Sequence, residues 1–357
     1  MKQVAIVGIQ GVPAKYGGFE TLVENIIGDN GSPEVSYTVF CSGRDYDTRM
    51  ETYKGARLKY VPLFHANGAQ STPYDIVSML MTLKGYDTVV VLGVSGCLFL
   101  PIYRLLYRKR LVVNIDGLEH RREKWGRFAK KFLKASEAMA VKWADVVIAD
   151  NKGIQDYVQE TYHKPSALIA YGGDHVLTNV TEDRTKEVLQ AYGLQADGYA
   201  VSICRIEPEN NSHMILKAFA EVGKELVFIG NWNRSDYSRK LKEEYRGCKN
   251  IRMVDAVYDI EVLYVLRSQC KCYVHGHSAG GTNPSLVEAM YFGKPILAYD
   301  VVYNRETTEN KAMFFKNSAQ LQALLQQKTA GNGEALREVA KRRYTWKHIA
   351  EEYEKLY

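Results

Sequence analysis

Arg205 has the side-chain type and the position best suited to binding an anionic ligand. It ends the apolar, β-rich run "YAVSICR", residues 199–205. A guanidinium group stays charged at any working pH, and its planar fork matches the oxygens of a phosphate. A cation at the tip of a buried strand therefore predicts a phosphate contact. An ion pair with a neighbouring acid such as Glu207 is the alternative interpretation.

A glycine-rich corner follows later in the chain, in "GHSAGGTNPSLVEAM", residues 276–290. Its loop consists of Gly280, Gly281, Thr282 and Asn283. Pro284 suits the first turn of a helix, so one of the last two loop residues can cap that helix, and the loop N–H groups can hold a second phosphate. Glu288 lies one turn inside the helix, where its carboxylate can accept hydrogen bonds from a sugar diol. A solvated helix residue is the alternative.

A third corner lies near the N-terminus, where Gly17 and Gly18 follow the strand-like run "QVAIVGI". Apolar residues recur at helical spacing after it, so we expect a helix to begin at Gly18 or Phe19. The two glycines would let another molecule approach the free N–H groups and the positive end of the helix dipole. A tight turn with Glu20 complementing the dipole is the alternative. The spacing does not match the dinucleotide fingerprint GxGxxG, which counts against NAD.

His275 and His277 alternate along a predicted strand and therefore share a face, as two metal ligands would. No third ligand of matching spacing is visible, and no DxD-like pair ends a strand. Hydrogen-bonded histidines lining a cleft are therefore favoured, and we expect no cofactor and no obligatory metal.

The segment "HRREKWGRFAKKFLKAS", residues 120–136, predicts a basic amphipathic helix. Its apolar stripe consists of Trp125, Phe128, Phe132 and Leu133, and the surrounding cations are Arg121, Arg122, Lys124, Arg127, Lys130, Lys131 and Lys134. Such a helix can lie on an anionic membrane leaflet. An ordinary packed helix with a solvated basic face is the alternative.

Two parallel sheets are needed to position these corners. Apolar runs alternate with helical patterns from "QVAIVGI" as far as "SALIA" at residues 166–170, and the alternation restarts at "YAVSICR" after a polar interval and continues to "PILAYD" at residues 295–300. This order predicts two doubly wound α/β domains, in which ligands bind outside the carboxyl ends of the strands. We place the first domain at residues 1–172 with a returning helix at 343–357, and the second at 173–342.

Composition excludes several classes of protein. A net charge of +6 over 357 residues is too small for a duplex-DNA binder, so we expect no nucleic-acid partner. The six cysteines have neither CxxC nor zinc spacing and predict free thiols in a reducing cytoplasm. No run of 18 apolar residues is present, so we expect a cytoplasmic protein, peripheral at most on the inner face of the cell membrane.

The motifs "CRIEPENN", "NIDGLEH", "HGHSAGGTNPSLVEAMYFGKPILAYD" and an N-terminal "YGGFE" together resemble the retaining GT-B glycosyltransferases of family four. The residues of these motifs are similar to those of the bacterial rhamnosyltransferase branch, whose N-terminal domain was formerly of unknown function. The resemblance covers nearly the whole chain, and "RYTWKHIAEEYEKLY" resembles the helix that crosses back to the first domain. It implies two Rossmann-like domains facing each other across a cleft, with the first domain on the acceptor side.

The resemblance also implies roles for individual residues. Gly17 and Gly18 would approach the donor diphosphate, Arg205 would neutralise it and Glu288 would hold the ribose. Asp116 and His120 would border the sugar and belong with Arg205 to the catalytic set.

Two positions depart from the family pattern. Asn210 stands where the family has a Lys, and Gly280 stands where it has a Glu. Both are still expected among the donor-binding residues. Because the Lys is missing, the charge of the second phosphate would be met by the backbone amides of residues 280–283. Because the Glu is missing, a usual contact to the donor hydroxyls is lost, and a glucose-like donor is less expected.

The activity implied is transfer of a sugar, L-rhamnose from dTDP-rhamnose, with retention onto a saccharide or polyprenyl-diphosphate-linked acceptor in polysaccharide synthesis. Alternatives are a UDP- or GDP-hexose donor, a nucleotide-sugar epimerase or phosphorylase of the same architecture, and a non-catalytic nucleotide-sugar binding subunit. Fold alone does not separate them.

Overall fold

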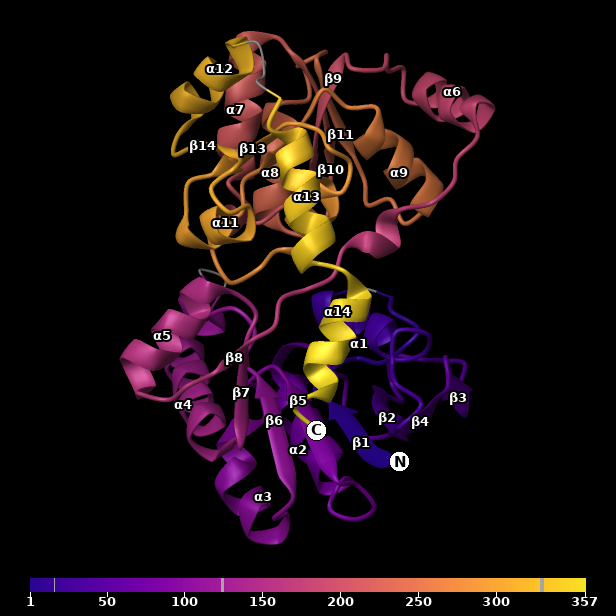
Figure 1. The fold of residues 1–357 in the computed structure, drawn as a ribbon. Coiled ribbons are helices and arrows are strands. Elements are labelled where there is room, and N and C mark those ends of the chain that lie inside the picture. The colour runs from indigo at the N-terminus through magenta and orange to yellow at the C-terminus, as the bar shows by residue number, and fades with distance from the viewer. Residues whose placement is uncertain (16, 123–124, 328–330) are drawn as a thin grey trace. The chain divides into compact units, whose positions relative to one another are not determined.

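The computed structural model describes residues 1–15, 17–122, 125–327 and 331–357 and divides the chain into two compact units. The first unit comprises residues 1–172 and 346–357, and the second comprises residues 173–345. Each unit is built on a parallel sheet of its own with helices packed against it (Figure 1).

The first unit has an eight-stranded sheet in the order β3-β4-β2-β1-β5-β6-β7-β8. Neighbouring strands are parallel, except that β3 pairs antiparallel with β4. The strands are β1 (Lys2–Val7), β2 (Val35–Ser42), β3 (Thr52–Tyr53), β4 (Ala56–Val61), β5 (Thr88–Leu92), β6 (Arg110–Asn114), β7 (Val146–Ala149) and β8 (Ala167–Leu168). The helices are α1 (Gly18–Ile26), α2 (Ser71–Leu80), α3 (Leu100–Leu106), α4 (Arg127–Trp143), α5 (Lys152–Tyr162) and α14 (Trp346–Glu354), with short 3-10 turns η1 (Gly68–Gln70), η2 (Cys97–Phe99) and η3 (Glu119–Arg121).

Helix α14 brings the C-terminal segment back onto this unit. Trp346, Ile349 and Tyr353 are buried in one core with the apolar faces of β1 and α1. Inside this core the Asn114 side-chain amide donates to the Tyr353 hydroxyl at 2.7 Å. The last helix therefore supports the end of β6, from which the segment with Asp116 and His120 continues.

The second unit has a six-stranded, all-parallel sheet in the order β11-β10-β9-β12-β13-β14. The strands are β9 (Tyr199–Ile203), β10 (Glu225–Ile229), β11 (Ile251–Val254), β12 (Cys272–His275), β13 (Ile296–Tyr299) and β14 (Met313–Phe315). The helices are α6 (Glu182–Ala191), α7 (Ser212–Val222), α8 (Asp236–Glu244), α9 (Ile260–Ser268), α10 (Pro284–Met290), α11 (Val302–Thr307), α12 (Ser318–Gln326) and α13 (Gly333–Arg343), with 3-10 turns η4 (Asp174–Val176) and η5 (Pro208–Asn210).

The returning segment begins at Trp346 and not at residue 343. The preceding residues belong to the second unit because α13 runs to Arg343 and the buried Tyr344 hydroxyl donates to the Thr307 carbonyl at 2.9 Å. The pattern of residues from 343 onward gave no sign of the boundary between Thr345 and Trp346.

Strand order reverses direction once in each sheet. In the second unit the chain starts at β9, moves outward through β10 and β11, and then returns to add β12 on the other side of β9. In the first unit β1 and β5 flank the equivalent point. The loops at the carboxyl ends of such paired strands diverge and leave space for a ligand.

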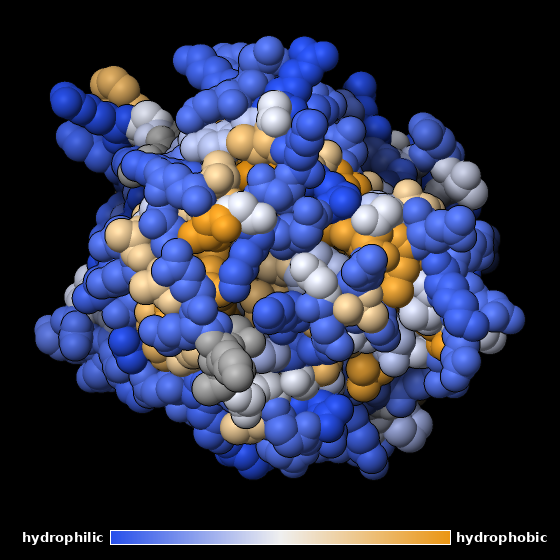
Figure 2. Space-filling view, turned by 90° about the horizontal axis from the view of Figure 1, so that it is seen from above, coloured by the Kyte–Doolittle hydropathy of each residue, from blue (hydrophilic) through white to orange (hydrophobic). Residues whose placement is uncertain are grey.

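The surface view in Figure 2 shows mostly hydrophilic side chains, with hydrophobic ones in small separate patches. No helix of the described residues has both the length and the apolar character needed to cross a bilayer.

Candidate functional site

Arg205 follows β9 at the point where strand order reverses in the second unit. Its Nε lies 3.9 Å from the Glu207 carboxylate, and 39% of the Arg205 side chain is exposed. A contact of this length between partly exposed groups contributes little free energy. The guanidinium group is therefore able to turn toward an incoming anion.

The loops after β9 and β12 are joined by Asn210, whose side chain bridges them. Its amide nitrogen donates to the Arg205 carbonyl at 2.7 Å, and its Oδ1 lies 2.8 Å from Nδ1 of the buried His277. Gly276 allows this close approach, because a Cβ there would lie 2.1 Å from the Asn210 carbonyl oxygen. Asn210, predicted as a donor contact, thus fixes the geometry of the two loops.

His275, on β12, is also buried, and its Nε2 has no hydrogen-bond partner within the described part of the chain. Burial lowers the pKa of His275 to about 3, so the imidazole is neutral at any working pH. Among the described residues, no group of three or more His, Cys, Asp or Glu is placed to hold a metal ion. The expectation that no metal is required stays a prediction.

The glycine-rich corner has the local structure expected from its sequence. Asn283 caps α10 by accepting a hydrogen bond from the Ser285 N–H at 3.0 Å, and Pro284 occupies the first turn. Gly280 has φ 94°, a backbone conformation that L side chains rarely adopt. Gly280, Gly281 and Thr282 are buried and follow the same strand, β12, as His277.

Glu288, on α10, has partners that the sequence did not reveal. One carboxylate oxygen is ion-paired with Arg267, whose side chain is only 4% exposed, and the other lies 3.7 Å from Nε2 of His175. We expected the Glu288 carboxylate either to be solvated or to bind a ribose, but it already contacts Arg267 and His175 of its own unit. A ribose diol would have to share it with them.

In the first unit Gly17 is the N-terminal cap of α1, which begins at Gly18 as predicted. Glu20 reaches back over it: a Cβ on Gly17 would lie 2.0 Å from the Glu20 carboxylate, and Gln10 N donates to the same group at 2.9 Å. Burial raises the pKa of Glu20, and the nearby charge of Asp116 acts in the same direction. In this structure, then, the Glu20 carboxylate already lies at the N-terminal end of α1.

Asp116 lies just beyond β6 in a left-handed backbone conformation with φ 60°. Its N–H donates to the Asn114 side-chain oxygen at 3.0 Å, and Asn114 in turn contacts Tyr353 of α14. Non-glycine residues in this conformation are uncommon and tend to occur at functional sites. Asp116, beyond the carboxyl end of β6, is near enough to Glu20 for its charge to contribute to the raised pKa of that carboxyl.

His120 contacts the buried carboxylate of Glu137, a partner that the sequence did not reveal. Nδ1 of His120 lies 2.8 Å from Oε2 of Glu137, whose side chain is 3% exposed. The other oxygen, Oε1, accepts from the Tyr157 and Tyr162 hydroxyls, each at 2.6 Å, and from Lys134 at 3.1 Å. Burial alone would raise the pKa of Glu137, but these hydrogen bonds and charges bring it below its usual value.

The predicted basic helix at residues 120–136 is displaced along the chain, because Gly126 caps a helix that begins at Arg127 and continues to Trp143. Trp125 precedes α4 and its Nε1 donates to Glu119 at 3.0 Å, so it is not part of the apolar stripe. Lys134, predicted as one of the cations around the stripe, contacts Glu137 through its ammonium group and lies over the Tyr157 ring. Lys124 falls outside the described residues.

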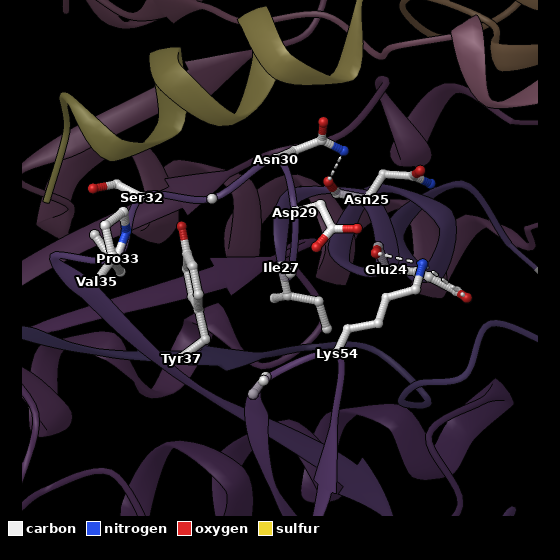
Figure 3. A pocket seen from close by; sticks show the side chains of 14 residues that line it. Glu24, Asn25, Ile27, Asp29, Asn30, Ser32, Pro33, Val35, Tyr37 and Lys54 are labelled. Carbon is white, nitrogen blue, oxygen red and sulfur yellow. Dashed lines mark hydrogen bonds and ion pairs between the residues drawn. The ribbon is translucent and has the colours of Figure 1, made fainter.

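A separate cavity of about 510 Å³ lies where α1 ends and β2 begins (Figure 3). Lys54 and Glu24 border it with an ion pair of 3.5 Å, and Tyr37 lines the other side. It is at the amino end of β2, whereas Asp116 and His120 follow the carboxyl end of β6. The cavity therefore does not belong to the candidate site.

Comparison with known proteins shows two family matches. Residues 186–341 match the model "Glycosyl transferases group 1", and residues 1–174 match "Domain of unknown function (DUF1972)". The chain carries an N-terminal DUF1972 domain followed by a group 1 glycosyltransferase domain. No curated protein sequence matches this glycosyltransferase significantly.

Several solved structures resemble the glycosyltransferase over nearly its full length. Sucrose-phosphate synthase of Thermosynechococcus elongatus has a TM-score of 0.83 at 18% identity, covering 100% of this chain and 98% of the other. Anabaena HepE in complex with UDP-glucose has a TM-score of 0.77 at 17% identity, covering 100% and 99%. The catalytic domain of Arabidopsis thaliana starch synthase IV, bound to ADP and acarbose, has a TM-score of 0.70 at 13% identity, covering 99% and 98%. At these identities the likeness shows the fold, which is GT-B with two Rossmann-like domains.

Proposed function

We propose that this glycosyltransferase transfers L-rhamnose from dTDP-rhamnose, with retention, to a saccharide carried on a polyprenyl diphosphate. The observation that carries the proposal is the junction of the loops after β9 and β12. There a partly exposed cation, Arg205, follows one strand, and the buried loop of residues 280–282 follows the other. The Asn210 bridge holds the two loops together.

The chemistry follows from the charge of a diphosphate leaving group. The bond between the sugar C1 and a phosphate oxygen breaks, and a bond to the acceptor oxygen forms on the same face. The acceptor proton passes to the departing diphosphate. Arg205 and the amides of the 280–282 loop would stabilise the negative charge that develops there. The donor would contact the backbone of Gly18 only after the Glu20 carboxylate moves away from the N-terminal end of α1.

Asp116 and His120 are the residues of the first unit that we assign to the sugar and the acceptor. Nδ1–H of His120 donates a hydrogen bond to the Glu137 carboxylate, which leaves Nε2 to face a substrate hydroxyl. Burial lowers the pKa of His120 below its usual value, and the charge of Glu137 opposes this effect. The imidazole is therefore neutral at pH 7 and able to accept a hydrogen bond.

Replacing Glu137 with Gln is expected to lower kcat on the order of 10- to 100-fold, because His120 loses the charge that fixes its tautomer. The pKa of His120 should fall further, so the limb of the pH–rate profile that follows His120 should move to lower pH. Steady-state kinetics across pH measure both effects. Glu160→Gln, an exposed change on α5, is the control. An unchanged profile together with unchanged kcat would show that Glu137 has only a structural role.

The donor preference rests on Gly280. A Glu at this position would contact donor hydroxyls in the family pattern, yet φ 94° at Gly280 is a conformation that a Glu rarely adopts. The conformation of this loop therefore favours Gly at position 280, and the loop has no carboxylate there. A UDP-hexose is the second candidate, because the similar HepE structure contains UDP-glucose.

A transfer assay with a panel of donors tests the proposal. We expect faster transfer from dTDP-rhamnose than from UDP-glucose or GDP-mannose, and unchanged transfer in EDTA. Faster transfer from UDP-glucose would show that the assignment of dTDP-rhamnose as the donor is wrong. Loss of turnover in EDTA that magnesium or manganese restores would refute metal independence.

A further inference from the structure

The loop that follows β5, residues 93–97, lies between two parts of the candidate site in the first unit. Strand β5 pairs with β1 on one side and with β6 on the other. A Cβ built on Gly93 would lie 3.8 Å from the Phe19 ring of α1. The Gly93 N–H donates to the carbonyl of Asn114, the last residue of β6, at 2.9 Å. The loop therefore adjoins both the first turn of α1 and the segment that carries Asp116.

Helix α4 holds this loop from one side through a buried serine. The Ser136 hydroxyl donates to the Val94 carbonyl and accepts from the Leu98 N–H at 3.0 Å. The next residue along α4 is Glu137, which contacts His120. One turn of α4 thus fixes both the loop after β5 and the imidazole of the candidate site.

Helix α2 holds the loop from the other side through Asp75, a buried acid that takes no part in the proposed transfer chemistry. Asp75 is only 4% exposed, and its carboxylate accepts a hydrogen bond from the Ser95 hydroxyl. Thr72, one turn earlier on α2, donates to the Ser95 carbonyl at 3.2 Å. Gly96 allows this close approach, because a Cβ there would lie 2.5 Å from the Cβ of Asp75. Ser95 itself is partly exposed, so α2 orients a hydroxyl that a ligand can reach.

The charge of Asp75 determines which way the Ser95 hydroxyl points. Burial raises the pKa of Asp75 to about 7, and the hydrogen bonds from Ser95 and the Gly96 N–H act against this effect. Above this pH the carboxylate only accepts hydrogen bonds, so Ser95 directs its proton to it and keeps lone pairs to accept a hydrogen bond from a ligand. The neighbouring titratable groups, Tyr74 and Cys97, are neutral at pH 7 because burial raises the pKa of both.

We propose that Ser95 belongs to the binding subsite for the acceptor saccharide and that Asp75 is its positioning residue. Ser95 accepts a hydrogen bond from a hydroxyl of the acceptor while its own proton lies on the Asp75 carboxylate. A sugar hydroxyl fits this place because it is a neutral donor, whereas an ionised phosphate oxygen has no proton to donate and would be repelled by the charge of Asp75. The inference rests on the proposed function for the class of ligand, but not on the identity of the donor sugar.

Steady-state kinetics of Ser95→Ala and Asp75→Asn test the proposal, with a polyprenyl-diphosphate-linked saccharide as acceptor and whichever sugar nucleotide supports transfer. Both changes should raise KM for the acceptor about tenfold, as loss of one hydrogen bond does, and leave KM for the donor unchanged. Ser318→Ala is the control, because it removes a serine hydroxyl of the second unit that donates to the Met214 carbonyl at 3.0 Å. It should change neither constant, and thermal unfolding should show that every variant is folded.

The pH dependence of the acceptor KM separates positioning from a merely structural role of Asp75. In wild type this KM should rise as the pH falls below about 7, because protonated Asp75 no longer draws the Ser95 proton toward it. The rise should be absent in Asp75→Asn, whose side chain does not titrate, while any limb that belongs to His120 should remain. A rise of unchanged midpoint in Asp75→Asn would overturn the positioning role.

The assignment of Ser95 is overturned if Ser95→Ala transfers sugar with an unchanged acceptor KM, or if its KM for the donor rises as much as that for the acceptor. If wild type transfers no sugar from any nucleotide, the proposed function fails, and calorimetric titration with the same lipid-linked saccharide decides the inference separately. Wild type must then bind this saccharide, and Ser95→Ala must bind it about tenfold more weakly. Equal binding by the two proteins, or no binding by wild type, would overturn the inference.

Discussion

Replacing Arg205 with Ala is expected to lower kcat by about 100- to 1,000-fold while the protein stays folded. The guanidinium group is the cation placed to meet the leaving diphosphate, and its charge matters most when that group departs. Because the side chain is 39% exposed and its ion pair with Glu207 is a loose 3.9 Å contact, its loss leaves no buried cavity. Steady-state kinetics and thermal unfolding measure the two effects separately.

Arg246 provides a matched control for Arg205. It makes an Arg–Glu contact of similar length, 3.8 Å to Glu243, on an exposed segment of the same unit. Arg246→Ala should leave kcat unchanged. Arg205→Lys, which keeps the charge but loses the planar fork, should recover part of the activity. Near-normal turnover in a folded Arg205→Ala variant would remove this residue from the site.

Gly276→Ala is expected to abolish measurable donor binding. The added Cβ would lie 2.1 Å from the Asn210 carbonyl oxygen and 2.9 Å from Cδ1 of Ile215, so the loops after β9 and β12 must move apart. Separation breaks the contact of Asn210 with His277 and displaces the neighbouring Arg205. Overpacking of this kind costs about 1–3 kcal/mol of stability. Calorimetric titration with the donor and thermal unfolding measure the two consequences.

Gly247→Ala is the control for that substitution, because no atom lies within 4 Å of a Cβ built there. It should bind the donor like wild type. If Gly276→Ala also binds like wild type, the junction of the two loops is not part of the donor site, whatever its effect on stability.

The fold class could be predicted because buried parallel strands carry a strong local signal. Each apolar run from "QVAIVGI" to "PILAYD" became a strand, and the α/β class with two parallel sheets is confirmed. The strands that were missed, β3 and β14, are two and three residues long. Segments this short are fixed by pairing with a longer neighbour and have too few residues for a periodic pattern.

The candidate site could be predicted only where its geometry is local. The cap of α10, predicted as Thr282 or Asn283, and the start of α1 depend on adjacent residues and could be predicted from the sequence; the structure shows Asn283 as the cap. The partners of Glu288 and His120 are far along the chain: Arg267 is on α9, and Glu137 is on α4. Only the folded backbone brings such groups together, so residue type and spacing did not reveal them.

The central claim is that this chain is a catalyst that moves a sugar from a nucleotide donor. The measurement that tests it most directly is incubation of the purified protein with radiolabelled sugar nucleotides and a polyprenyl-diphosphate-linked saccharide, followed by separation of the lipid products. We predict labelled lipid with wild type, most of it from dTDP-rhamnose, and a loss of label with Arg205→Ala. Donor binding without labelled product from any sugar nucleotide would contradict the account and favour a non-catalytic binding subunit.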